Sequence, residues 1–339
     1  MRLAHLPVLR CPATLRPLEC KVEATENDRV KTGELIEPVD GRRYPVVNFI
    51  PRFVPVENYA SNFGLEWNTH ATTQYDGVSG VNLTRKRFFS VTGAAQDMKG
   101  QSILECGSGS GRFTEVALGT GAFVASFDYS NAVEANYGSN GGNPNLLLVQ
   151  ASLYEMPFPR DYFDLAFCFG VLQHTPDPAK SFHAIPPMVK PGGWVSTDVY
   201  RTGLIQSVLQ TRYWVRPFTK NHKDPHKLYQ GIKAYVDFMW PLVRIIRKIP
   251  VIGAPINWRL MIADYSRELP DADDKTLKEW AYLNTFDALS PAYDLPQSLA
   301  TFRRWHEEAR LQDVVVGEGD KVGYGWSGWV GRGRKPAAT

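Results

Sequence analysis

The stretch ILECGSGSGRFTEVAL, residues 103–118, places three glycines at alternate positions directly after an apolar run. The apolar run predicts a buried strand, and the residues after the last glycine predict a helix. A glycine-rich turn between a strand and a helix lets a ligand approach the backbone more closely than a β-carbon would allow. Such turns bind several nucleotide-like cofactors, so the glycine spacing and the neighbouring segments must identify the ligand.

The spacing of these glycines separates two kinds of cofactor turn. A dinucleotide-binding turn has the pattern G-x-G-x-x-G, in which the third glycine allows close packing of the helix on the strand. Arg112 occupies that third position here, and the pattern is instead E-x-G-x-G-x-G, from Glu105 through Gly107 and Gly109 to Gly111. The glycines alone are weak evidence, so the order of the following segments matters.

Predicted strands and helices alternate on both sides of the turn. Apolar runs of strand length lie at 102–107, 122–128, 145–152, 163–172 and 194–200, with helical segments at 111–119, 130–138 and 177–189. The chain then becomes helical from Arg201 to about Ser290, within an insertion over residues 201–297, and closes with a helix at 298–311 and strands at 312–318 and 323–333. This alternation predicts an α/β fold with a parallel sheet covered on both faces by helices.

Four of these segments carry a family resemblance. ILECGSGSGRFTE, FVASFDYS, SLYEMPFPRDYFDLAFCFGVLQHTPDP and MVKPGGWVSTDVY follow one another in this order. Together they resemble the motifs of class I S-adenosylmethionine-dependent methyltransferases, well over residues 101–200 and in outline over 298–333. The resemblance implies a Rossmann-like sheet of seven strands, mostly parallel with the last strand antiparallel. It also implies S-adenosylmethionine as cofactor and S-adenosylhomocysteine as product.

The cofactor site is expected at the carboxyl ends of the strands. Asp128 ends the second strand near the usual ~20-residue distance from the glycine turn at which a carboxylate meets ribose hydroxyls. Ser152 stands where the family usually has an aspartate that contacts the adenine, and its hydroxyl can accept the same hydrogen bond without charge assistance. The predicted cofactor residues are Glu105, Gly107, Ser108, Gly109, Gly111, Asp128, Tyr129, Ser130, Ser152, Leu153, Phe169, Gly170, Trp67 and Gln74. For Trp67 and Gln74, simple packing is the alternative interpretation.

The N-terminal segment resembles the small Trm112-like zinc ribbon that precedes some bacterial methyltransferase domains. Zinc needs four ligands, normally in two closely spaced pairs. Cys11 is present, but Thr14 stands where its partner would be, IEP replaces the second pair, and Cys20 does not restore the spacing. We therefore expect a degenerate module without metal.

The chain is predicted to divide into four units. They are residues 1–56 for this β module, 57–98 for a connector and helix over the cofactor site, 99–200 with 298–333 for the methyltransferase core, and 201–297 for a helical substrate cap.

Catalysis of methyl transfer to a hydroxyl requires a general base within hydrogen-bond reach. His174 is the first candidate, because it follows the fourth strand at the edge of the sheet where ligands bind. A structural role in bracing its loop is the alternative for this histidine. Asp287 and Tyr293 are the second choice, since their segment returns from the insertion toward the sheet.

Charge is distributed unevenly along the chain. Residues 201–260 contain eleven Lys or Arg and two acids, a balance of +9 in a chain of 339 residues whose net charge is +3. Such a segment favours an anionic partner. We expect a small anionic or glycan-type acceptor from natural-product or polysaccharide biosynthesis. An RNA methyltransferase and a catalytically inactive scaffold remain alternatives.

Other partners and the location of the protein are less constrained. We expect no nucleic acid as partner, and peripheral contact with a membrane and the oligomeric state stay open. The sequence lacks a signal-peptide apolar region and a transmembrane run, and its four scattered cysteines do not form a disulfide framework. These features predict a cytoplasmic protein.

Overall fold

A seven-stranded sheet forms the centre of the computed structural model, which describes residues 1–55, 58–202, 211–220, 222–319 and 328–337. The strand order is β10-β11-β9-β8-β5-β6-β7. The strands are β5 (Ser102–Cys106), β6 (Phe123–Asp128), β7 (Leu146–Gln150), β8 (Phe163–Cys168), β9 (Val189–Tyr200), β10 (Gln312–Glu318) and β11 (Gly328–Arg334). Those from β7 to β9 pair in parallel, whereas β11 runs antiparallel to β9 and β10. The predicted Rossmann-like sheet is therefore confirmed; the start of its last predicted strand, 323–327, lies outside the described residues.

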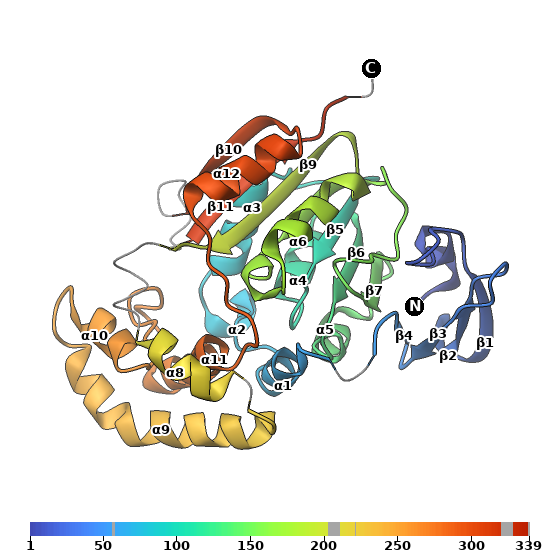
Figure 1. Cartoon of the computed structure of the whole chain (residues 1–339). Coiled ribbons are helices and arrows are strands. Elements are labelled where there is room, and N and C mark those ends of the chain that lie inside the picture. Colours follow the sequence, from blue (N-terminus) through green and yellow to red (C-terminus); the bar gives the residue numbers. More distant parts are fainter. Residues whose placement is uncertain (56–57, 203–210, 221, 320–327, 338–339) are drawn as a thin grey trace.

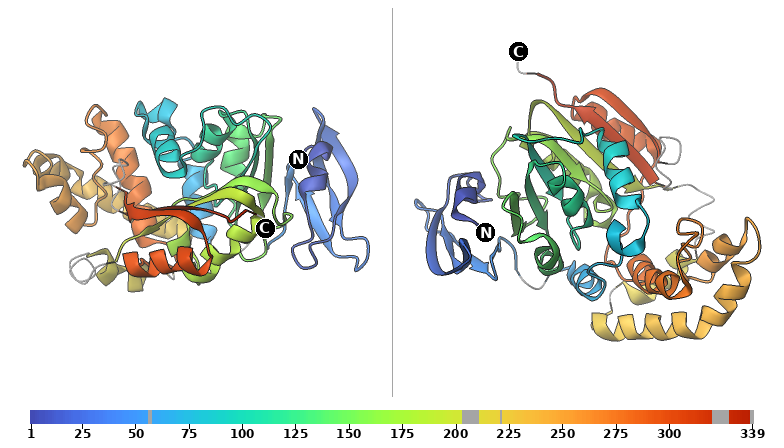
Figure 2. Two further views of the ribbon diagram at one scale, coloured as in Figure 1. Left: turned by 90° about the horizontal axis from the view of Figure 1, so that it is seen from above. Right: turned by 180° about the vertical axis from the view of Figure 1, so that it is seen from behind.

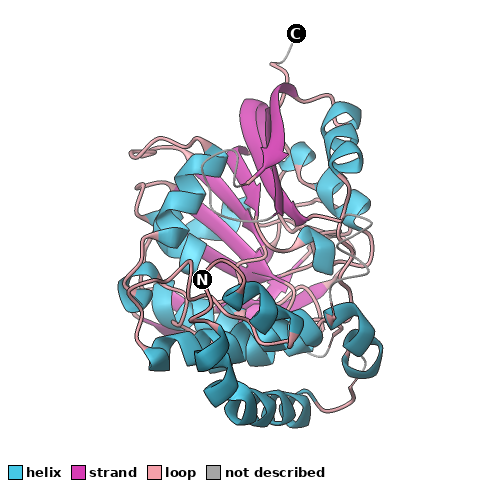
Figure 3. Ribbon diagram, turned by 90° about the vertical axis from the view of Figure 1, so that its left-hand side faces the viewer, coloured by secondary structure: helices cyan, strands magenta, loops and turns pink. Residues whose placement is uncertain are grey.

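Successive side chains of the central strands enter different cores, because a strand turns alternate residues to opposite faces. Leu104 packs with α6 (Pro178–Ala184) and α12 (Leu299–Glu308) on one face. Ile103 packs on the other face with the helices α3 (Leu83–Thr92), α4 (Arg112–Leu118) and α5 (Val133–Asn140). Burial of both faces explains why these strands read as continuous apolar runs. Figure 3 shows the strands between the two helical layers.

A separate antiparallel sheet is built from the N-terminal segment. Its strands, in the order β1-β2-β3-β4, are β1 (Glu19–Glu26), β2 (Arg29–Ile36), β3 (Arg43–Val47) and β4 (Ile50–Pro51). The 3-10 helix η1 (Leu3–Val8) precedes them. This sheet lies beside the β7 edge of the central sheet, where the Phe53 amide donates to the Gln150 carbonyl at 2.8 Å. It lies at the opposite end of the molecule from the helical insertion (Figures 1 and 2).

The segment between the two sheets contains more helix than the sequence indicated. Only α3 was expected, but α1 (Ser61–Thr69) and the single turn α2 (Asp76–Ser79) precede it. The buried residues of α1 are Asn62, Gly64 and Glu66. This helix therefore lacks the apolar stripe by which amphipathic helices are recognised.

The helical insertion begins and ends at adjacent points on the sheet. The chain leaves after β9 and returns beside it, since the Gln297 amide donates to the Tyr200 carbonyl at 2.8 Å. The inserted helices are α8 (Arg212–Thr219), α9 (Pro225–Ile246), α10 (Gly253–Arg259) and α11 (Asp274–Leu289). They pack around a core of their own that includes Trp240, Trp280 and Phe286. This insertion, which we call the cap, faces the carboxyl ends of the strands.

Aspartate and serine caps set the helix starts. The Asp177 side chain accepts from the Lys180 amide at the start of α6, and the Ser298 hydroxyl accepts from the Thr301 amide at the start of α12. Asp224 and Asp273 cap α9 and α11. Within the described ranges, none of the helices combines the length and the apolar character needed to cross a membrane.

Candidate active site

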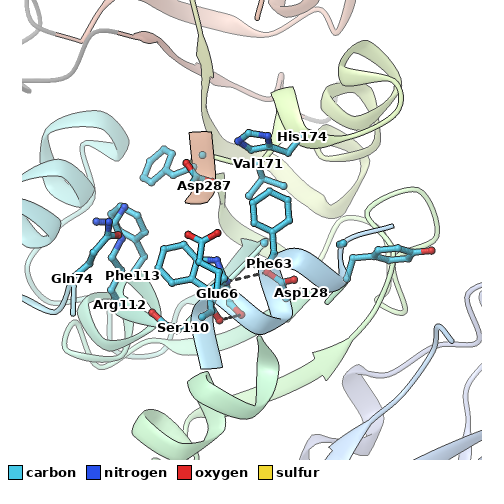
Figure 4. A pocket seen from close by; sticks show the side chains of 18 of the residues that line it. Phe63, Glu66, Gln74, Ser110, Arg112, Phe113, Asp128, Val171, His174 and Asp287 are labelled. Carbon is cyan, nitrogen blue, oxygen red and sulfur yellow. Dashed lines mark hydrogen bonds between the residues drawn. The ribbon is translucent and has the colours of Figure 1, made fainter. Parts of the chain in front are cut away.

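The glycine turn after β5 brings its backbone to the edge of a cavity of about 240 Å³ (Figure 4). Gly107 has a φ of +80°, and a β-carbon there would lie 2.3 Å from Cγ2 of Val171. Gly109 has a φ of +51°, and its β-carbon would lie 3.2 Å from the indole of Trp67. Both positions therefore need glycine, for backbone conformation and for space.

Asp128 stands beside this turn at the end of β6. Its Oδ2 accepts from the Gly109 amide at 2.9 Å, and its Oδ1 accepts from the amide and the hydroxyl of Ser130 at 2.8 and 2.7 Å. The carboxyl is partly accessible at the cavity wall. Burial raises its pKa, while the hydrogen bonds oppose the shift. Asp128 thus holds the turn and still has lone pairs for a ligand hydroxyl.

Glu105 lies below the turn, and the cavity lining does not include it. Its Oε2 accepts hydrogen bonds from the hydroxyls of Thr114 and Ser126. Its Oε1 is buried and has no hydrogen-bond partner among the described residues. Burial raises the pKa of this carboxyl to about 7. The geometry favours the role of ordering the turn over direct ligand contact.

Helix α1 and the loop after it cover the turn from the opposite side. The indole of Trp67 packs on Gly109, and Phe63 borders the same space. Gln74 lines the cavity and donates weakly to the Asn284 side chain of α11, at 3.4 Å. Residues of this connector therefore contact both the glycine turn, through Trp67, and the cap helix α11, through Gln74.

The end of β8 forms the next part of the wall. Phe169 and Gly170 line the cavity, and the Gly170 amide donates to Oδ1 of Asp198 at 2.6 Å. Asp198 is fully buried on β9 and forms an ion pair with Arg87 of α3. Burial raises the pKa of Asp198, and the charge of Arg87 opposes that shift. Arg87 also packs over the rings of Phe169 and Phe113, so this wall is fixed by charge and by stacking.

His174 projects into the cavity from the 3-10 turn η2 (Leu172–His174), as Figure 4 shows. Its Nδ1 lies 3.0 Å from the backbone carbonyl oxygen of Tyr293. A carbonyl only accepts, so Nδ1 carries the proton and Nε2 of the neutral ring is left with its lone pair. Nε2 is buried and has no hydrogen-bond partner among the described residues. The ring is thereby fixed at the cavity wall with Nε2 unpartnered.

Asp287 faces the same space from α11. The hydroxyl of Tyr200 lies 3.4 Å from its Oδ2, a long hydrogen bond that leaves the carboxylate capacity for another donor. Burial raises the pKa of Asp287, and a positive charge on His174, once that ring is protonated, opposes the rise. Tyr293 does not line the cavity; its backbone orients His174 instead.

Most of the predicted site residues border one cavity. Those that line it are Trp67, Gln74, Gly107, Ser108, Gly109, Asp128, Tyr129, Leu153, Phe169, Gly170, His174 and Asp287. Those that do not are Glu105, Gly111, Ser130, Ser152 and Tyr293. Ser152 was expected to meet the adenine, but its hydroxyl accepts from the Tyr154 amide at 3.1 Å and Ala151 lines the wall. Ser130 donates hydrogen bonds to Asp128, and Gly111 is the N-cap residue of α4.

Sequence reasoning missed a second set of lining residues. Most of them are aromatic or charged: Tyr59, Phe63, Glu66, Arg87, Arg112, Phe113, Phe127, Tyr154, Tyr200, Tyr265, Glu268 and Trp280. The others are Ala60, Leu83, Ser110, Ala151, Val171, Thr175, Leu283 and Asn284. Many come from the connector and the cap, which have no motif of their own. The only available signal was the density of aromatic residues in these two segments.

Comparison with known proteins agrees with this geometry. Residues 104–197 match the family described as "Methyltransferase domain". A ubiquinone biosynthesis O-methyltransferase of Thiobacillus denitrificans is 34% identical over 102 residues, which are 29% of this chain and 44% of the relative. One from Paraburkholderia phymatum is 33% identical over 134 residues, which are 38% and 57% of the two chains. The chain thus spans about half the length of the curated relatives it matches.

Solved structures were also compared. A putative S-adenosylmethionine-dependent methyltransferase from Methanococcus maripaludis is 15% identical, with 84% of this chain and 98% of that one covered and a TM-score of 0.45. Human N-acetylserotonin methyltransferase in complex with S-adenosylmethionine is 11% identical, with 84% and 61% covered and a TM-score of 0.40. The family match over residues 104–197 and the strand order of the sheet support a class I methyltransferase core in this part of the chain. Its cofactor is S-adenosylmethionine.

Proposed function

We propose that the chain methylates a hydroxyl group of a small acceptor that binds between the sheet and the cap. When bound, S-adenosylmethionine supplies a methyl group activated by the sulfonium sulfur. The chain would hold the cofactor with the turn at Gly107 and Gly109, the carboxylate of Asp128, and the cover formed by Trp67. The glycine cradle, which a β-carbon would fill, is the observation that fits this group.

The catalytic part of the proposal rests on one observation, the orientation of His174. Its Nδ1–H donates to the Tyr293 carbonyl, so the unpartnered Nε2 is free to take the proton of an acceptor hydroxyl. The rings of Phe63 and Tyr200 pack against the imidazole and restrict its rotation. Asp287, on the same cavity, would stabilise the imidazolium that forms. The remaining task of the site is alignment of the acceptor and exclusion of water.

His174→Ala tests this assignment. We expect formation of S-adenosylhomocysteine from a panel of hydroxylated acceptors to fall at least about 100-fold, the usual range for a lost general base. Affinity for S-adenosylhomocysteine, measured by calorimetry, should stay within about twofold. His183→Ala is the matched control, because His183 pairs with Glu308 outside the cavity. Full turnover by His174→Ala would remove this residue from the role.

The charge of the acceptor is less well supported. In the part of the chain that the structure describes, at least five of the eleven cations that suggested an anionic or glycan-type acceptor pair with acids of the cap. Arg212 and Arg216, for example, lie 3.8 and 3.9 Å from Asp294. Arg244 lies 3.6 Å from Asp274. We therefore propose a small hydroxylated acceptor, and its anionic or glycan-type character stays a prediction.

The two alternatives can be tested directly. An RNA acceptor would be indicated by strongly salt-dependent retention of the protein on RNA. An inactive scaffold would be indicated by failure to bind S-adenosylhomocysteine, which the intact turn and Asp128 argue against. The derivation of the N-terminal sheet from a Trm112-like zinc ribbon also stays a prediction.

A further inference from the structure

Glu66 is a buried acid that the steps above do not use. It lies on α1, one residue before Trp67, and its side chain is 0% exposed. Both carboxyl oxygens lack a hydrogen-bond partner among the described residues. The residue borders the cavity, and Figure 4 shows it in the same space as Phe63 and Asp287.

An unpartnered carboxyl in this position is costly for the folded protein. Burying a polar group without a hydrogen bond is unfavourable, and burying it charged is more so. Burial raises the pKa of Glu66 well above its usual range, and the negative charge of Asp287 raises it further. A raised pKa favours the protonated form of the carboxyl, which has one hydrogen to donate and lone pairs to accept. Because buried polar groups in native proteins nearly always have a hydrogen-bond partner, a bound ligand is expected to supply the one that Glu66 lacks.

The surroundings of Glu66 indicate what that partner is. Asp287 is the acid whose charge acts on the pKa of Glu66, and its side chain is partly accessible from the cavity. Aromatic side chains from the cap and the sheet line the same cavity, among them Tyr200, Tyr265 and Trp280. Walls of this kind suit a flat ring, and the two carboxyl groups suit hydrogen-bond donors on that ring.

We propose that Glu66 and Asp287 together bind the acceptor, which is a neutral ring with two hydroxyl groups. One hydroxyl would lie at Asp287 and His174, where it is methylated, and the other would hydrogen-bond to Glu66. This inference rests on the proposed function and specifies its substrate class. Glu66 is in this view a specificity residue for the acceptor, distinct from the cofactor-binding turn.

The test compares catechol, which has two adjacent hydroxyl groups, with phenol, which has one. Binding of each to the full-length protein saturated with S-adenosylhomocysteine is measured by calorimetry or by ligand-detected NMR. We expect catechol to bind at least about tenfold more tightly than phenol to the wild-type protein. Glu66→Leu should abolish that preference and leave affinity for S-adenosylhomocysteine within about twofold. Glu66→Gln, which keeps hydrogen-bonding capacity, should retain part of the preference.

Thermal stability provides a readout that a merely structural role would not give. Glu66→Leu should raise the melting temperature, because it replaces an unpartnered buried acid by an apolar side chain of similar size. Glu37→Leu is the matched control: Glu37 is also 0% exposed, but it accepts from the amides of Val39 and Asp40 at 3.3 and 2.7 Å. That variant should lower the melting temperature and leave catechol binding unchanged.

Several outcomes would overturn the inference. Equal affinity of the wild-type protein for catechol and phenol would do so, as would a Glu66→Leu variant that keeps the preference. A tenfold loss of S-adenosylhomocysteine affinity in Glu66→Leu would assign the residue to the cofactor instead. Failure of the wild-type protein to bind S-adenosylhomocysteine at all would count against the proposed function itself, and is distinguishable from these results.

Discussion

Replacing Glu105 by Gln should change how the stability of the protein depends on pH. In the folded protein burial raises the pKa of this carboxyl from the ordinary 4.5 to about 7, so the folded state holds the proton more tightly than the unfolded state. A raised carboxyl pKa gives a stability contribution that is fully present below about pH 4.5. The contribution is lost as the pH rises from about 4.5 toward 7, because the carboxyl of the unfolded chain ionises in this range while the folded protein still holds the proton.

The size of the effect follows from these two values. A difference of roughly two to three pH units, at about 1.4 kcal/mol each, costs the wild-type protein about 3 kcal/mol well above pH 7. About 2–3 kcal/mol of this loss falls between pH 5 and pH 8. Glutamine cannot ionise, so the loss should vanish in the variant. Its amide nitrogen replaces the unpartnered Oε1 and costs about 1–2 kcal/mol at every pH.

Urea unfolding at pH 5 and pH 8 measures the difference. The free energy of unfolding of Glu105→Gln minus that of the wild type should increase by about 2–3 kcal/mol from the lower to the higher pH. The constant cost of the amide cancels in this comparison. A difference that stays the same at both pH values would refute the reasoning, since Glu105 would then be charged in both states.

Three further predictions concern the cofactor half of the cavity. Gly107→Ala should lower S-adenosylhomocysteine affinity more than about tenfold in calorimetry, because the left-handed backbone costs an L-residue about 1–2 kcal/mol and the new methyl group meets Val171. Adding Val171→Ala should restore part of the affinity. If the double variant binds no more tightly than Gly107→Ala, the clash with Val171 is contradicted. Asp128→Asn should lower the same affinity about 10- to 100-fold, since charge-assisted hydrogen bonds contribute about 1.5–3 kcal/mol; a change below about threefold would exclude a ligand contact. Trp67→Ala should reduce the tryptophan fluorescence change on adding S-adenosylhomocysteine, and an undiminished change would show that this indole does not cover the ligand.

The sequence predicted the sheet well because its strands obey simple rules. Strands buried on both faces are continuous apolar runs, and the order of glycine turn, acidic strand end and later motifs fixed their arrangement. The helix α1 was missed for an equally physical reason. The side chains that it buries, Asn62 and Glu66, are polar, so no apolar stripe marks it. Departures of this kind are expected where a helix lines a functional site and does not only pack on a core.

The limits of prediction are clearest for the proposed base. His174 could be singled out because it follows a strand at the ligand-binding edge of the sheet, which is a local property. Its suitability as a base depends on the Tyr293 carbonyl, which is 119 residues away along the chain and reaches the ring only because the cap returns beside β9. The side chains of Asp287 and Tyr293 come from the same segment, yet the first faces the cavity while the second does not line it. Sequence reasoning named both as the second choice for catalysis, because their segment returns from the insertion toward the sheet. Only the packing of the cap on the sheet separates Asp287, whose side chain lines the cavity, from Tyr293, whose backbone carbonyl accepts from the His174 ring.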